Sequence, residues 1–104
     1  MLLLDSFDLS MIRKFPASIV VEEVTSGQAR IMAQANLEPV ISNRDVAAVY
    51  GNELGLQVRA HPEYVTMVPG DIALVGRFHG HLPPGSDRLP EGVSLQWLLV
   101  TVVP

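Results

Sequence analysis

The most restrictive feature of this sequence is its final segment, residues 93–103, which is apolar at nearly every position. Successive side chains of a strand point to opposite faces, so a strand with one solvated face alternates apolar and polar residues. Here apolar residues occupy both alternating sets of positions. The pattern predicts a central strand that is covered on both faces by other parts of the chain.

Hydrophobic runs and turn residues divide the rest of the chain into short elements. Strands are predicted at 1–4, 18–24, 39–41, 56–59, 64–68 and 72–78, in addition to 93–103. Three helices are predicted: 9–15, capped by Asp8 and stopped by Pro16; one that Thr25 or Ser26 caps and that extends to about Asn36; and one that Ser42 or Asn43 caps and Gly55 ends. The mixture indicates an α/β fold with a mixed sheet flanked by two or three helices.

Size and charge narrow the class of protein. A chain of 104 residues with 48% hydrophobic residues is predicted to form a single domain, residues 1–104. The formal net charge is −4 and Lys14 is the only lysine, which disfavours duplex DNA and acidic membranes as partners. Arginine binds phosphate through its planar guanidinium, so a local anion site is compatible with this charge. The absence of cysteine excludes disulfides and thiolate metal sites.

A near-duplicated stretch separates the last two predicted strands. The sequence HLPPG at 81–85 is followed by RLPEG at 88–92. Arg88 and Glu91, three residues apart in a Pro/Gly loop, suit a surface ion pair. They also suit an active site in which Arg88 stabilises developing negative charge and Glu91 acts as a base or orients Arg88.

Two of the three histidines lie at the start of this stretch. His79 and His81 alternate, so in an extended segment their side chains face the same side. A third ligand is missing from the sequence around them, and a zinc site needs three or four, so no metal site is predicted. They remain either plain loop residues or ligand-contacting and catalytic groups, with His61 as a third titratable candidate.

Four motifs resemble, in order, the small viral and plasmid ring nucleases that act against type III CRISPR signalling. They are LDSFDLSMI at 4–12 with FP at 15–16, the helix from Asn43 to Gly55, GDIALV at 70–75, and RLPEG at 88–92. The resemblance spans nearly the whole chain. It implies a homodimer that binds cyclic tetra-adenylate in a pocket across its two-fold axis. It also implies phosphodiester cleavage without a metal or other cofactor.

The resemblance also assigns roles to residues. In the family, a histidine that starts the mid-chain helix is the general acid, and the arginine and glutamate of the RLPEG motif assist. Arg88 and Glu91 match those two positions. Asn43 occupies the histidine position and cannot titrate, so His79 or His81 is the expected replacement acid. The expected ligand contacts are Asp5, Ser6, Ser42, Asn43 and Arg44.

The sequence departs from the family in the loop and at the helix start. The interval before Arg88 is longer than usual, and a gapless alignment places HLPPG on the motif instead, which leaves open which copy lines the pocket. Ser42 replaces a glycine, Val46 a threonine and Asp5 an asparagine. Pro62 lies near the position of a further arginine of the family.

The expected function is binding of a cyclic oligoadenylate and its metal-independent cleavage in the cytoplasm, which is the host cytoplasm for a viral protein. The first alternative is a protein that sequesters the cyclic nucleotide without cleaving it. The second alternative is a structural or protein-interaction module that keeps only the fold, because a shared fold does not by itself transfer function.

Overall fold

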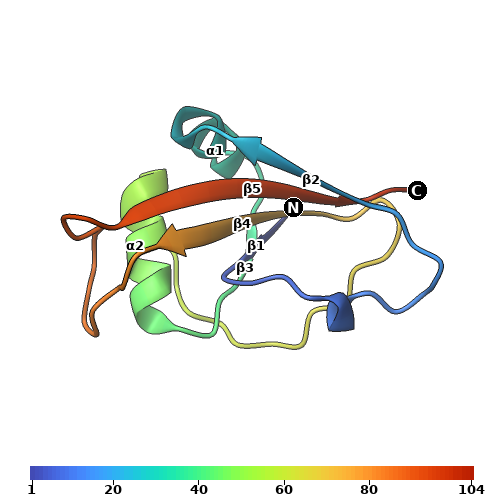
Figure 1. Ribbon diagram of the computed structural model, residues 1–104, viewed down its shortest axis with the longest axis horizontal. Helices are drawn as coiled ribbons and strands as arrows, with labels where there is room; N and C mark the ends of the chain where they lie inside the picture. The colour runs from blue at the N-terminus through green and yellow to red at the C-terminus, as the bar shows by residue number, and fades with distance from the viewer.

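A five-stranded mixed sheet organises the molecule, with the strands in the spatial order β2-β5-β4-β1-β3 (Figure 1). The computed structural model describes residues 1–104. Strand β1 lies parallel to both β3 and β4, whereas β5 is antiparallel to β2 and β4. The strands are β1 (Leu2–Leu4), β2 (Ile19–Val24), β3 (Glu38–Val40), β4 (Ile72–His79) and β5 (Ser94–Val102). The predicted α/β class with a mixed sheet is confirmed.

Strand β5 is internal, as its composition predicts. It lies between β2 and β4, and it forms the longest ladder of the sheet with β4. Trp97 is buried on one face of β5, and Val100 and Val102 are buried on the other. Leu98 is only half-buried, so the cover over the second face is incomplete.

Two helices pack on one face of the sheet and form the larger core with it. They are α1 (Ser26–Ala33) and α2 (Arg44–Leu54) (Figure 1). Thr25 and Gln28 form a capping box at the start of α1, and Gly55 ends α2 in the left-handed conformation, with φ of 73°. The buried members of this core are Leu3, Ala29, Ala33, Ile41, Ala47, Tyr50, Leu54, Leu74 and Trp97.

The opposite face of the sheet is covered by irregular chain instead of a helix. Ile12 and Met67 form an isolated parallel bridge there, and the amide of Met67 donates to the carbonyl of Met11 at 2.7 Å. Both side chains are buried against the sheet. Both helices therefore flank the sheet on one face, and irregular chain covers the other.

The predicted helix 9–15 is wrong beyond its first turn. Only a 3-10 turn forms, η1 (Leu9–Met11), which Asp8 caps by accepting from the amide of Ser10. Proline disfavours helical geometry in the residue before it, which here is Phe15. The carbonyl of Met11 is used in the bridge to Met67 rather than in a longer helix.

Two of the predicted strands are wrong, and one predicted helix is too long. Residues 56–59 and 64–68 form no strand, and α1 ends at Ala33 rather than near Asn36. The amide of Leu56 donates to the Gly51 carbonyl at the end of α2, and the segment then runs beside this helix instead of pairing with a strand. Its apolar side chains pack on the core without entering a ladder, because burial satisfies an apolar run in a loop as well as in a strand.

The helices are short. Neither has the length and apolar character that crossing a membrane requires.

Candidate functional site

The expected ligand residues gather where the parallel strands end. Asp5 and Ser6 follow β1, while Ser42 and Asn43 lie between β3 and α2. Because β1 and β3 are parallel neighbours, their carboxyl ends meet at one edge of the sheet. In open α/β sheets, ligands bind outside this edge.

Asp5 and Ser42 are joined directly, although they are far apart in the sequence. One carboxylate oxygen of Asp5, Oδ2, accepts from the Ser42 amide at 3.1 Å and from the Ser42 hydroxyl at 3.0 Å. The two donors partly offset the negative charge of the carboxylate. The contact fixes the end of β1 against the start of the α2 segment.

Asn43, at the position of the family's histidine, is engaged as a helix cap. Its Oδ1 accepts from the amides of Asp45 at 2.8 Å and Val46 at 3.2 Å. Arg44 follows as the first residue of α2, is exposed, and forms no ion pair. Asn43, unlike the family's histidine, cannot donate a proton as a general acid.

Tyr50 lies beneath this edge and connects three elements. Its hydroxyl accepts from the Gly76 amide at 2.9 Å and lies 3.0 Å from the Leu4 carbonyl and 3.1 Å from the Gly76 carbonyl, either of which can accept its proton. Burial raises the pKa of Tyr50 well above its usual range, so the hydroxyl stays protonated and can donate. The side chain is part of the core, and it also supports the edge that holds Asp5.

The duplicated stretch forms the same turn twice. The Ser86 amide donates to the Pro83 carbonyl at 3.2 Å, and the Val93 amide donates to the Pro90 carbonyl at 3.1 Å. The glycine at the third position of each turn, Gly85 or Gly92, has a positive φ, 82° and 83° respectively. Type II turns require this conformation, which explains the glycine of both copies.

The two copies have different surroundings. The amide of Gly85 donates to Asp45 Oδ2 at 2.9 Å, which fixes the first copy against the first turn of α2. The second copy leads directly into β5, and a Cβ on Gly80 would lie 3.2 Å from the carbonyl oxygen of Gly92. The first copy, which contains His81, is therefore the one bonded to the helix start.

The expected catalytic residues are not joined to one another. Arg88 pairs with Asp87 at 3.4 Å, with its side chain 75% exposed, and no hydrogen bond or ion pair links it to Glu91. His79 Nε2 lies 3.2 Å from Gln96 Oε1, and His81 forms no side-chain hydrogen bond. The surface ion pair considered between Arg88 and Glu91 does not form, and Arg88 instead contacts the adjacent Asp87. No group of three or more His, Asp and Glu side chains is placed to hold a metal ion.

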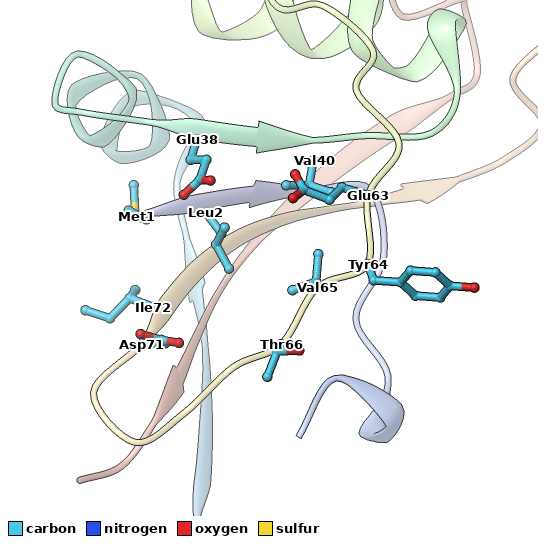
Figure 2. Close-up of a pocket in the computed structure, with 10 residues that line it drawn as sticks. All are labelled: Met1, Leu2, Glu38, Val40, Glu63, Tyr64, Val65, Thr66, Asp71 and Ile72. Carbon is cyan, nitrogen blue, oxygen red and sulfur yellow. The ribbon is translucent and has the colours of Figure 1, made fainter. Parts of the chain in front are cut away.

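Two hollows beside β1 and β3 are acidic. Figure 2 shows the first, of about 310 Å³, where Glu38, Glu63 and Asp71 line an apolar floor and the ring of Tyr64 points away. The second, also about 310 Å³, is lined by Asp5, Ser6 and Ser42 together with further carboxylates. Neither is lined by an arginine or a lysine, so neither suits a bare phosphate group.

A third hollow, of about 430 Å³, lies on the sheet face opposite the helices. Asp5 and Ser6 line it, together with Arg77 of β4, which forms no ion pair. Its other walls are mostly apolar: Phe7, Val21, Val75, Gly76, Phe78, Leu98 and Val100. Arg77 is absent from the residues expected from the sequence, although an arginine within the apolar run IALVGRF is a signal that could have found it.

Comparison with known proteins identifies a shared fold. No protein-family model matches the chain, and no curated protein matches its sequence. Among solved structures, B116 of Sulfolobus turreted icosahedral virus (STIV) superposes with a TM-score of 0.79 and 18% sequence identity. The superposition covers 96% of this chain and 97% of B116. This likeness extends over the whole domain and concerns its architecture.

Proposed function

We propose that this protein binds a cyclic oligoadenylate between two copies of the chain and thereby antagonises type III CRISPR signalling. The observation that supports this most directly is the sheet-face hollow. There Asp5, Ser6 and Arg77 surround an apolar floor, and the Asp5–Ser42 hydrogen bonds connect the hollow to the start of α2. The whole-chain family resemblance and the viral source of the fold neighbour support a viral or plasmid protein that acts in a host cytoplasm.

The residues of the hollow suit different parts of such a ligand. The Arg77 guanidinium can donate two parallel hydrogen bonds to a phosphodiester. The Asp5 carboxylate and the Ser6 hydroxyl can accept from a ribose hydroxyl or from the amino group of adenine. The apolar walls suit the faces of the bases, which are themselves apolar.

A second copy of the chain is the proposed partner at this face. Val21 is 53% exposed there, and Leu98 beside it is half-buried, with no helix over either. A two-fold axis through the face would place two copies of Arg77 around one ring, so each copy supplies half of the site. This arrangement lets a small domain enclose a ligand that is itself symmetric.

Sequestration is favoured over rapid cleavage. Metal-free cleavage needs an acid to protonate the leaving 5′-oxygen, and Asn43 cannot supply a proton. Arg88 is paired with Asp87 and is separate from Glu91. We therefore propose that the bound ring remains intact for long periods.

Slow cleavage through His81 is the second candidate. The Gly85–Asp45 hydrogen bond favours it, because that bond fixes the loop containing His81 against the helix start where the family has its acid. In this mechanism Glu91 takes the proton of the 2′-hydroxyl, whose oxygen bonds to phosphorus, while the bond from phosphorus to the 5′-oxygen breaks and His81 protonates that leaving oxygen. The products are a 2′,3′-cyclic phosphate and a free 5′-hydroxyl, and Arg88 or Arg77 stabilises the charged phosphorane between them.

The test is incubation of the protein with cyclic tri-, tetra- and hexa-adenylate in the absence of metal, followed by chromatography of the denatured mixture. Intact ligand retained by the protein supports sequestration. Linear products that disappear in His81→Ala support cleavage. Arg77→Ala should weaken retention roughly tenfold or more, because a charge-assisted hydrogen bond is lost, whereas Arg13→Ala should not. Failure to retain any cyclic nucleotide would contradict both candidates.

A further inference from the structure

A separate hollow lies on the helix side of the molecule, beside the first turns of α2. It has a volume of about 360 Å³ and lies between α2 and the segment that follows it. Arg44 of α2 and Arg59 of that segment both line it. The remaining lining is small and apolar: Ala47, Ala48, Val58 and Ala60.

The segment that contains Arg59 is anchored at both ends. The amide of Leu56 donates to the Gly51 carbonyl at 3.0 Å, and the amide of His61 donates to the Ile41 carbonyl at 2.8 Å. Gly51 permits this approach, since a Cβ there would lie 2.7 Å from the carbonyl oxygen of Leu56. Arg59 is therefore held alongside the helix by backbone contacts.

The charges around this hollow are unbalanced. Neither Arg44 nor Arg59 forms an ion pair or donates a side-chain hydrogen bond within the chain, and no carboxylate lines the hollow. The carboxylate of Asp45, next to Arg44 in the sequence, accepts from the amide of Gly85. Both arginines are exposed, and an anion placed in the hollow between them would be attracted to both.

We propose that this hollow binds a phosphate group through the guanidiniums of Arg44 and Arg59. A neighbouring hollow of about 530 Å³ adjoins the arginine-lined one, since both are lined by Ala47, Ala48 and Val58. Asp87 also lines this neighbouring hollow and can accept a hydrogen bond from a sugar or base. The site therefore has room for a nucleoside attached to the phosphate. The phosphate can come from a free nucleotide or from the cyclic oligoadenylate of the proposed function.

The test is calorimetric titration of the full-length protein with inorganic pyrophosphate and, separately, with cyclic tetra-adenylate. Arg44→Gln and Arg59→Gln should each weaken pyrophosphate binding about tenfold or more, because each removes a charge-assisted contact. Arg13→Gln removes the same charge from an exposed residue elsewhere and should leave binding within about twofold, as expected for a screened charge at long range. Pyrophosphate affinity should also fall as salt is added.

The pyrophosphate titration tests whether the hollow binds phosphate, and the cyclic tetra-adenylate titration tests whether that phosphate belongs to the ring. Loss of pyrophosphate binding with unchanged cyclic tetra-adenylate binding supports a separate nucleotide site. Loss of both supports the phosphate hollow and indicates that phosphates of the ring occupy it, which would move the ring from the sheet-face hollow of the proposed function to the helix side. Wild-type protein that does not bind pyrophosphate, or Arg44→Gln and Arg59→Gln variants that bind like Arg13→Gln, would overturn it. Neither of these two overturning results would affect the proposed function, because its hollow lies on the sheet face opposite the helices.

Discussion

At the scale of single residues, Gly76 and Tyr50 illustrate how a buried polar group can support a site that it does not line. The Tyr50 hydroxyl is satisfied by backbone groups of β1 and β4, in a region from which water is excluded. A Cβ on Gly76 would lie 2.5 Å from the tyrosine oxygen. The glycine is therefore required by the close approach of the ring, and the ring holds together the strands from which Asp5 and Arg77 emerge.

We expect Gly76→Ala to lower the free energy of unfolding by roughly 1–3 kcal/mol, because the added methyl group displaces Tyr50 and overpacks the core. Urea denaturation monitored by circular dichroism measures this change. Gly27→Ala is the matched control, since the nearest atom to a Cβ there is 3.9 Å away. Within helix α1, that substitution should be neutral or stabilise by up to about 1 kcal/mol. Equal stability of the two variants would contradict the steric argument.

At the scale of elements, residues 42–45 at the start of α2 make three different structural contacts. Asn43 caps the helix, Ser42 connects it to Asp5, and Asp45 fixes the loop through Gly85. Each contact uses a polar atom that a ligand could otherwise have used. The same segment is thus stable and well positioned, while Arg44 is the residue of this turn whose side chain has no partner within the chain.

We expect Asn43→Ala to destabilise the protein by about 1 kcal/mol, because the amides of Asp45 and Val46 lose their acceptor. Asn43→Asp should stay within a few tenths of a kcal/mol of the wild type, since aspartate caps equally well. Chemical denaturation of both variants provides the measurement. If the alanine variant matched the aspartate variant, capping by Asn43 would contribute nothing to stability.

At the scale of the whole molecule, the two sides of the sheet differ. Both helices cover one face and bury the larger core, while irregular chain leaves part of the other face open around Val21 and Leu98. Apolar side chains at this position are typical of an interface between subunits. The asymmetry therefore places the proposed dimer contact and the proposed phosphate hollow on opposite faces of one small domain.

We expect the wild-type protein to be dimeric and Val21→Lys to shift it strongly towards the monomer, because the substitution places a charge in the proposed contact. Val20→Lys is the matched control on the same strand, since alternate residues of β2 point to opposite faces. Sedimentation equilibrium over a range of protein concentrations measures both. A Val21→Lys variant that remains as dimeric as Val20→Lys would exclude this face as the interface.

Much of the fold could be predicted from local pattern. The composition of 93–103 predicts a central strand, and helix α2 is indicated by apolar spacing, a capping asparagine and a terminal glycine. The strands predicted at 56–59 and 64–68 were wrong because apolar residues can be buried without pairing in a sheet. The outer edges of β2 and β3 are unpaired, but residues 56–60 instead run beside α2, held by the hydrogen bond from Leu56 to Gly51.

The sequence by itself determined which residues are apolar, where α1 begins, and where α2 begins and ends, because these properties depend on neighbours a few residues away. Only the tertiary structure decided that Asp5 bonds Ser42, that Arg77 shares a hollow with Asp5, and that Arg44 and Arg59 line another. The first copy of the duplicated stretch is likewise bonded to α2 only through the fold. These contacts join residues distant in sequence, so they depend on strand order and register, which local patterns do not specify.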